Sequence, residues 1–226
     1  SKVNRQVSAD DPIKVADNDA NKWVSRGSGK LIGALDAFPA IEVAGRVCLD
    51  AGASTGGFTA VLLERGATRV FSVDVGYGQL AWSLQQDPRV VVMDRFNVRN
   101  LAPSDLDDTP DLVVADLSFI SLRTVLPALR GSVAEASDFV LMVKPQFEVG
   151  RELLGKNGVV RDPATRADAV INVARSAEKI GLGCAGIAAS PLPGPSGNVE
   201  YFLWLRQDSP PMREDDVARA VADGPQ

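Results

Sequence analysis

Short apolar segments alternate with segments of helical spacing along most of this chain of 226 residues. The apolar segments have the length of strands and cover residues 47–51, 69–75, 89–93, 111–115, 139–143, 184–189 and 199–205. The segments with helical spacing are 58–64, 122–129 and 162–180. Strands separated by helices predict an α/β fold with a doubly wound, mostly parallel sheet. The last two strands are joined by the loop 191–198 without a helix, which predicts an antiparallel pair at one edge.

Composition places the chain among ordinary globular domains. Hydrophobic residues make up 45% and charged residues 23%, which excludes wholesale disorder and a disulfide scaffold. The length suits one domain with a small appendage, and we expect that domain at 22–206. Residues 1–21 are polar and acid-rich, and their segment 2–7 resembles a single strand, so we expect a linker with the remnant of an upstream domain, or a frayed terminus. The acidic tail at 207–226 is expected to hold a loosely docked helix.

The absence of histidine limits the chemistry of this chain. Ser-His-Asp and Cys-His catalysis and most zinc sites are excluded, and we expect no metal. Proton transfer must therefore use Lys, Asp, Glu, Tyr or water. The two cysteines, Cys48 and Cys184, each lie in an apolar stretch and are expected to be buried and reduced.

Apolar run length and net charge bear on location and partners. No secretory signal opens the chain, and no apolar run approaches the ~18 residues that a spanning helix needs. We therefore expect a soluble, cytoplasmic protein. The net charge of −5 counts against a nucleic-acid partner unless the basic surface is local or lies on a segment upstream.

A glycine-rich turn follows the strand at 47–51. Glycine lets the backbone approach a ligand closely, and ligands of open α/β sheets bind beyond the carboxyl ends of the strands. Asp74 closes the second strand at a spacing suited to ribose hydroxyls, and the Asp50 carboxylate suits an ammonium group. This pattern departs from the dinucleotide fingerprint and fits S-adenosylmethionine (SAM) better, although a tight turn alone would also need glycine. The residues expected to bind this cofactor are Asp50, Gly52, Ser54, Thr55, Gly56, Gly57, Phe58, Asp74, Val75, Tyr77, Asn97 and Asp116.

Four polar side chains form a candidate catalytic set. Asp116 ends the fourth strand and Lys144 ends the fifth, so both are expected at the same crevice as Gly52. A lysine that closes an apolar strand loses hydration, which disfavours its charged form, and such a lysine can take or relay a hydroxyl proton. Glu200 opens the last strand, and Lys30 lies ahead of an amphipathic helix. Two structural interpretations stay open, a solvated helix residue for Lys30 and an edge-strand charge for Glu200.

Six segments, in one order along the chain, carry a family resemblance. They are KWVSRG at 22–27, LDAGASTGGFT at 49–59, DVGYGQL at 74–80, ADLSFIS at 115–121, VKPQFE at 143–148 and PGPSGNVE at 193–200. On these segments the chain resembles the TlyA family of ribosomal RNA 2′-O-methyltransferases, whose members have also been called hemolysins. The resemblance implies a Rossmann-like, FtsJ-like class I methyltransferase fold that uses SAM. It also implies a seven-stranded, mostly parallel sheet with an antiparallel edge strand and helices on both faces.

The resemblance further implies roles for individual residues. The family's Lys-Asp-Lys-Glu tetrad falls on Lys30, Asp116, Lys144 and Glu200. The implied substrates are cytidines in 16S and 23S ribosomal RNA (rRNA), whose methylation in actinobacteria is tied to capreomycin and viomycin susceptibility. Two departures stand out. The family's N-terminal RNA-binding domain is not represented beyond the possible strand at 2–7, and Asn21 stands where the family's linker often begins with arginine.

Contact with RNA requires positive surface. Lys22 and Arg26 lie close together without an acid between them, and Arg151, Lys156 and Arg161 follow the fifth strand in a glycine-bearing loop. We expect Lys22, Arg26, Arg151 and Lys156 to meet RNA phosphates at the rim of the crevice. A charge run is equally compatible with a solvated face.

Three alternative functions stay open on the sequence alone. A SAM enzyme acting on a small molecule or a protein would work without RNA. A membrane-active hemolysin would need an amphipathic or spanning element, and none is visible. A ribosome assembly factor would bind SAM with methylation as a secondary property. We expect a monomer in each case.

Overall fold

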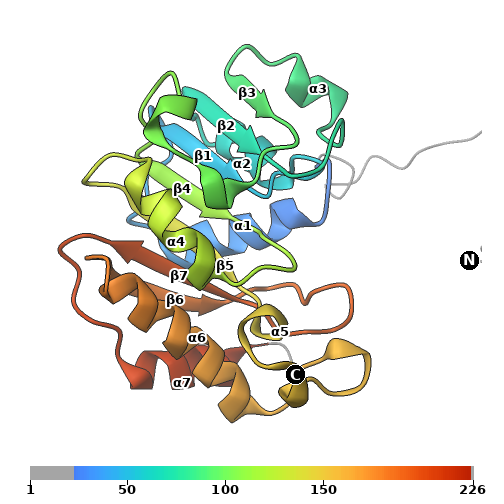
Figure 1. Ribbon diagram of the computed structural model, residues 1–226, viewed down its shortest axis with the longest axis vertical. Coiled ribbons are helices and arrows are strands. Elements are labelled where there is room, and N and C mark those ends of the chain that lie inside the picture. The colour runs from blue at the N-terminus through green and yellow to red at the C-terminus, as the bar shows by residue number, and fades with distance from the viewer. Residues whose placement is uncertain (1–22, 225–226) are drawn as a thin grey trace, which may run out of the picture.

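The computed structural model describes residues 23–224 of the chain (Figure 1). The expected strand at 2–7, the expected linker at 1–21 and the expected RNA-binding Lys22 lie outside the described residues. No helix among the residues described is both long and apolar enough to cross a membrane.

The described chain forms a seven-stranded sheet of order β3-β2-β1-β4-β5-β7-β6. Its strands are β1 (Val47–Ala51), β2 (Arg69–Val73), β3 (Val90–Met93), β4 (Leu112–Ala115), β5 (Asp138–Val143), β6 (Gly183–Ala189) and β7 (Tyr201–Arg206). The first five strands pair in parallel, whereas β7 pairs antiparallel with both β5 and β6. The predicted antiparallel edge is therefore confirmed, with β7 as the reversed strand and β6 outside it.

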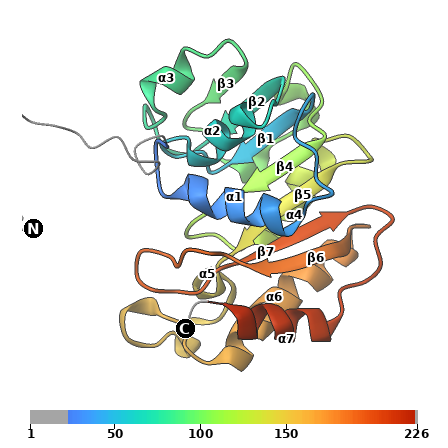
Figure 2. The same ribbon diagram turned by 180° about the vertical axis from the view of Figure 1, so that it is seen from behind.

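Helices cover both faces of the sheet, as Figures 1 and 2 show from opposite sides. They are α1 (Gly27–Ala37), α2 (Gly57–Glu64), α3 (Trp82–Gln85), α4 (Leu122–Gly131), α5 (Pro145–Glu148), α6 (Pro163–Glu178) and α7 (Glu214–Asp223). Four 3-10 turns join them: η2 (Val98–Asn100), η3 (Pro103–Asp105), η4 (Arg151–Leu153) and η5 (Lys156–Gly158). Helices α1, α2 and α3 share one hydrophobic core, and α4, α6 and α7 share the other.

Two expectations about helices need correction. Lys30 was expected ahead of a helix, but it lies inside α1, where it is buried. The tail helix was expected to dock loosely, but α7 places Val217, Ala220 and Val221 in the core shared with α6. An apolar stripe at helical spacing explains that tight packing, because it can be buried only against the rest of the domain.

The parallel part of the sheet sets the position of the site. Strands β1, β4 and β5 are buried almost throughout, because helices cover both of their faces. Their carboxyl ends meet along one edge, where the chain leaves β1 at Gly52, β4 at Asp116 and β5 at Lys144. Cys48 is buried and Cys184 partly buried, and both thiols are free.

Candidate functional site

The turn after β1 is folded tightly against the end of β4. Gly52 has φ of +88°, and a Cβ atom there would lie 2.6 Å from the backbone oxygen of Asp116. Gly56 caps α2 with φ of +96°, a left-handed conformation that favours glycine. The shape of the turn therefore requires glycine at these two positions. The backbone of the turn stays accessible from the space beyond the strand ends.

Asp74 stabilises the same turn from the end of β2. Its carboxylate accepts hydrogen bonds from the backbone N–H of Ser54, at 2.8 Å, and of Gly76, at 2.7 Å. The side chain remains partly exposed. One carboxylate therefore links the loops after β1 and β2 while it stays accessible to a ligand.

Two adjoining cavities lie beyond the strand ends and together form what we term the cleft. The β2 cavity has a volume of about 520 Å³ and is lined by Gly52, Ser54, Val73, Asp74, Val75, Gln79, Phe96, Asn97, Val98, Asp116, Leu117, Ser118, Phe119 and Ile120. The α1 cavity has a volume of about 310 Å³ and is lined by Ser25, Arg26, Gly27, Lys30, Gly52, Ala53, Ser54, Thr55, Gly57, Phe58, Asp116, Pro193 and Pro195. Because the two share Gly52, Ser54 and Asp116, a single elongated ligand can occupy both.

Two lysine–carboxylate pairs each have one member in the wall of the cleft, Lys30 in one pair and Asp116 in the other. Lys144 Nζ lies 2.6 Å from Asp116 Oδ1 and donates a hydrogen bond to Ser118 Oγ at 2.9 Å. Lys30 Nζ lies 2.5 Å from Glu200 Oε2, and both side chains are more than nine-tenths buried. The structure thus pairs all four residues of the predicted catalytic set. Neither the interpretation of Lys30 as a solvated helix residue nor that of Glu200 as a plain edge charge is compatible with this burial.

The structure does not bring Asp50 into the cleft. Its side chain has no exposed surface, lines neither cavity and accepts a hydrogen bond from Thr59 Oγ1 at 2.6 Å. Its other carboxyl oxygen has no hydrogen-bond partner, and burial raises the pKa of Asp50 to about 7. Asp50 is enclosed because β1 is covered on both faces, so the expected direct contact with an ammonium group stays a prediction.

The other predicted cofactor residues divide between the wall of the cleft and its surroundings. Gly56 is buried behind the turn and lines neither cavity. Tyr77 is exposed, and the Arg95 guanidinium lies 4.1 Å from the centre of its ring. The members that do line the cleft are Gly52, Ser54, Thr55, Gly57, Phe58, Asp74, Val75, Asn97 and Asp116.

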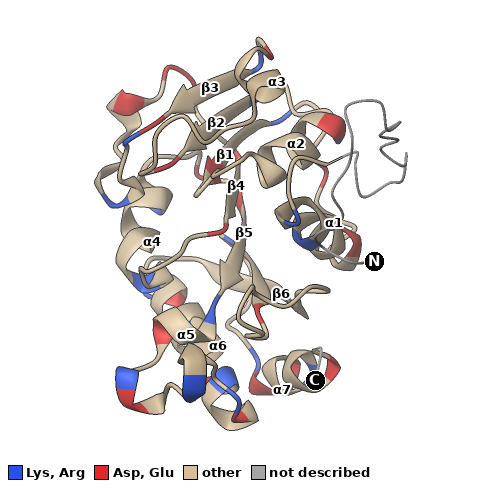
Figure 3. Ribbon diagram, turned by 90° about the vertical axis from the view of Figure 1, so that its right-hand side faces the viewer, with Lys and Arg blue, Asp and Glu red and all other residues tan. Residues whose placement is uncertain are grey.

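Of the predicted RNA-binding residues that the structure describes, Arg26 alone lines the cleft. Arg26 lines the α1 cavity and donates a hydrogen bond to the Pro193 carbonyl at 3.4 Å. Arg151 and Lys156 are exposed on η4 and η5 and line neither cavity. Figure 3 shows Lys and Arg positions gathered around α5 and α6, on the same side as these turns.

Phe119 is a cleft residue that strand and helix patterns do not identify. Its side chain is 91% exposed, lines the β2 cavity and packs on Phe147 with 5.1 Å between ring centres. Its φ of +63° is uncommon for a bulky residue. Strain of this kind is found at functional sites, so the local backbone presents the ring to the cleft rather than to the core.

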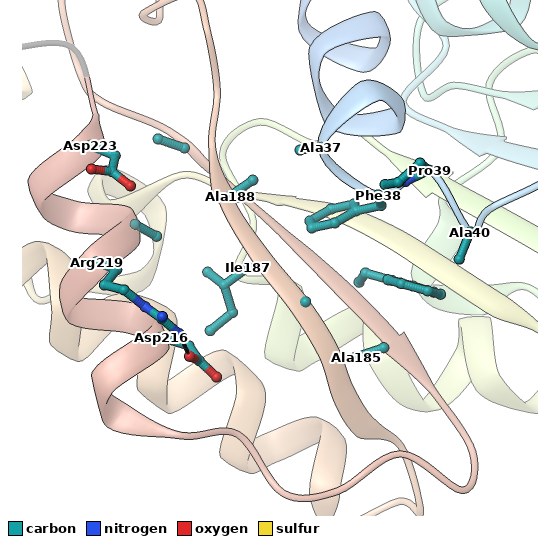
Figure 4. Close-up of a pocket in the computed structure, with 14 residues that line it drawn as sticks. Ala37, Phe38, Pro39, Ala40, Ala185, Ile187, Ala188, Asp216, Arg219 and Asp223 are labelled. Carbon is teal, nitrogen blue, oxygen red and sulfur yellow. Dashed lines mark hydrogen bonds and ion pairs between the residues drawn. The ribbon is translucent and has the colours of Figure 1, made fainter.

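A third cavity lies away from the cleft and shares no residue with it. It has a volume of about 700 Å³ and runs along the edge strand β6, between the end of α1 and α7 (Figure 4). Small apolar residues of β6 form much of its wall, with Asp216, Arg219 and Asp223 of α7 on one side. No cluster of three or more possible metal ligands occurs in the part of the chain that the structure describes.

Comparison with known proteins identifies the family. Residues 23–207 match the family described as FtsJ-like methyltransferase. Over 224 residues the chain is 59% identical to the 16S/23S rRNA (cytidine-2′-O)-methyltransferase TlyA of Mycobacterium tuberculosis, with 97% of this chain and 83% of that protein covered. The chain belongs to the FtsJ-like methyltransferase family. The 23S rRNA (cytidine-2′-O)-methyltransferase TlyA of Campylobacter jejuni is 33% identical over 183 residues, or 80% of this chain and 70% of that one.

Solved structures agree with this FtsJ-like membership. A structure named as a hemolysin from Streptococcus thermophilus matches with a TM-score of 0.85 and 41% identity, covering 89% of this chain and 74% of that chain. Fibrillarin from Aeropyrum pernix matches with a TM-score of 0.57 and 14% identity, covering 78% and 74%, which bears on the fold alone. The predicted Rossmann-like methyltransferase fold is confirmed.

Proposed function

We propose that this chain is a SAM-dependent 2′-O-methyltransferase that modifies cytidine riboses in 16S and 23S rRNA in the cytoplasm. The observation that carries the proposal is that Lys30 and Asp116 line one cleft beside the glycine-rich turn, and that each is ion-paired, Lys30 with Glu200 and Asp116 with Lys144. The names of the two TlyA relatives supply the substrate class.

The cleft residues fit SAM on three counts. Gly52 lines both cavities with backbone alone, and Asp74 offers a partly exposed carboxylate for ribose hydroxyls. The exposed amide of Asn97 suits an adenine edge. When bound, SAM supplies an electrophilic methyl group on a sulfonium. Asp116 lines both cavities, so its carboxylate is suited to lie where that positive charge would be.

The polar pairs have separable roles in the transfer. The reaction needs a ribose 2′-oxygen aligned with the methyl group and partial loss of the hydroxyl proton. Lys144 takes or steers that proton, and it is held in place by Asp116 and Ser118. Lys30 reaches the α1 cavity from α1 and is held there by Glu200, so this pair positions the ribose. Arg26 and the exposed basic turns η4 and η5 supply charge for RNA phosphates.

Direct detection of ribose methylation tests this proposal. We would incubate the chain and SAM with unmodified 30S and 50S subunits and measure 2′-O-methylcytidine by nucleoside mass spectrometry. We expect the modified nucleoside in RNA from both subunits. SAM binding without any methylated RNA would refute the rRNA substrate and favour a small-molecule or protein substrate. Growth rescue by an inactive variant would instead favour an assembly factor.

A further inference from the structure

A fourth cavity, with a volume of about 520 Å³, lies next to the cleft at the start of α6. This α6 cavity is lined by Val159, Val160, Arg161, Arg166, Pro193, Ser196, Gly197 and Val199. Pro193 also lines the α1 cavity, so one residue of the loop 191–198 separates the two spaces. A strand of RNA whose ribose occupies the cleft can therefore pass directly over the α6 cavity.

Arg166 is buried in the wall of this cavity and forms no ion pair with the described residues. Its exposed fraction is 5%, and one terminal nitrogen donates a hydrogen bond to the Arg161 carbonyl at 3.3 Å. Its Nε has no partner, and among the described residues no carboxylate lies within 4.0 Å of its guanidinium. Arginine stays charged at any working pH, and a buried charge is costly unless it is paired. The guanidinium therefore has a charge without an ion pair and an Nε donor without a hydrogen-bond partner.

The groups around Arg166 favour an anion. Asp162, four residues before it in the chain, is exposed, and its Oδ2 atom already accepts hydrogen bonds from Thr165 N and Thr165 Oγ1. The Tyr201 hydroxyl lies beside Arg166: burial raises the pKa of this phenol, and the charge and hydrogen bond of Arg166 act to lower it. Arg161 is exposed at the mouth of the cavity. Two arginines thus lie at one cavity, one at its wall and one at its rim.

The wall opposite Arg166 is held in place by an asparagine. Asn198 is buried, and its side-chain oxygen accepts a hydrogen bond from Val160 N at 2.9 Å. Its side-chain nitrogen donates to the Gly158 carbonyl at 3.1 Å. These two bonds tie the loop 191–198 to the segment before α6, so the cavity has a fixed wall rather than a chance gap between loops.

We propose that the α6 cavity binds a backbone phosphate of the RNA strand adjacent to the target ribose. This inference rests on the proposed function and deepens it, since it assigns phosphate binding to Arg166 and Arg161. A guanidinium binds phosphate through two parallel hydrogen bonds, which fixes orientation as well as affinity. A phosphate bound beside the cleft would set the position of the neighbouring ribose, whose 2′-hydroxyl must meet the methyl group in line.

Substitutions on the two arginines test the assignment in the full chain. Arg166→Lys keeps a charge but removes the planar fork, Arg161→Gln alters only an exposed side chain, and Arg175→Gln on the exposed face of α6 is the matched control. Affinity for unmodified 50S subunits would be measured at several salt concentrations, with kcat/KM for methylcytidine formation. Thermal unfolding and SAM titration would verify folding and cofactor binding.

We expect Arg161→Gln and Arg166→Lys to lower kcat/KM roughly ten- to hundredfold, as loss of a hydrogen bond to a charged group does. The slope of log affinity against log salt should fall by about 0.7–0.9 in Arg161→Gln, which loses a charge, and should change little in Arg166→Lys, which keeps one. If both variants show the same salt slope and the same kcat/KM as Arg175→Gln, the phosphate site is refuted, while the proposed methyltransferase function stands. If the unaltered chain forms no methylcytidine in either subunit, the proposed function fails first, and the RNA assignment of this cavity fails with it.

Discussion

The two halves of the sheet build the cleft in different ways. The parallel half, β3-β2-β1-β4-β5, contributes residues that directly follow strands, such as Gly52, Asp74 and Asp116. The antiparallel half contributes Glu200, which lies just before β7 and pairs with Lys30 of α1, 170 positions away in the sequence. The first half follows the general rule that strand ends converge, whereas the second depends on a pairing between residues far apart in the sequence.

In the proposed mechanism, the cofactor and the RNA substrate occupy different parts of this cleft region. The parallel half forms most of the β2 cavity, where SAM would be held. The start of α1, the glycine-rich turn and the loop 191–198 line the α1 cavity, and the same loop and the start of α6 line the α6 cavity. In the proposed mechanism the RNA would lie across these two cavities. Variants in the two halves should therefore affect SAM binding and RNA handling independently.

Replacing Lys144 should give the largest effect. The Lys144→Ala variant removes the group that takes or steers the hydroxyl proton, and positioned proton transfer contributes roughly 10²–10⁴-fold to rate. We expect a loss of that size in single-turnover methylcytidine formation, with SAM affinity nearly unchanged. Lys179→Ala, at an exposed position after α6, is the control. Activity within threefold of the control would exclude Lys144 from catalysis.

Breaking the buried pair in the antiparallel half should reduce stability as well as activity. In Glu200→Gln the buried Lys30 ammonium loses its counter-charge, and removal of one partner from a buried pair costs about 3–5 kcal/mol. The double variant Lys30→Met/Glu200→Leu should be less destabilised than Glu200→Gln, because no unpaired charge remains. Urea unfolding measures both. Equal losses in the single and double variants would show that packing, not charge, sets the cost.

Sequence patterns alone predicted most of the parallel half. Continuous apolar runs identified all five parallel strands, and the strand-end rule placed Asp116 and Lys144 at one crevice, where they form an ion pair. Asp50 shows the limit of that rule. It lies one residue before the end of β1, so its side chain points to a helix-covered face, whereas the rule describes only residues beyond the strand.

The antiparallel half was less predictable for a physical reason. Arg166 is a charged residue in a helix, which is typical of a solvated position. Only the return of the loop 191–198 from distant sequence forms the cavity that it lines. Lys30 and Glu200 were linked only through the family resemblance, since neither residue carries a local signal for its partner. The short helices α3 and α5 have a single turn each, too few residues to show a helical period.

Asp50 should make the stability of the parallel half depend on pH. Its pKa is raised to about 7 in the folded chain, whereas an unfolded aspartate titrates near 3.9. The folded state then binds more protons than the unfolded state between these values, so the free energy of unfolding falls as pH rises from about 4 to 7. The limit of that loss is about 4 kcal/mol for a shift of this size.

The Asp50→Asn variant isolates this contribution, because the amide does not titrate. We expect the difference in unfolding free energy between the variant and the unaltered chain to change across pH 4 to 7 and to level off above pH 7. Asp36→Asn, an exposed carboxylate paired with Arg65, is the control. A difference that stays constant with pH would mean that Asp50 is ionised throughout this range in the folded chain.

Replacing Asp74 should give the smallest effect, but it tests most selectively whether SAM binding and RNA binding are separate. The Asp74→Asn variant removes the charge and one of the two acceptor oxygens that bind Ser54 N and Gly76 N. We expect SAM affinity to fall roughly tenfold, consistent with the loss of one charge-assisted hydrogen bond. Affinity for ribosomal subunits should not change, because Asp74 lines neither the α1 cavity nor the α6 cavity.

Calorimetry measures the affinity for SAM, and a binding titration measures the affinity for ribosomal subunits. The control is Asp107→Asn, which removes an exposed carboxylate paired with Arg69. Equal weakening of both affinities would show that the β2 loop couples the halves, and the separation of cofactor side from RNA side would no longer hold.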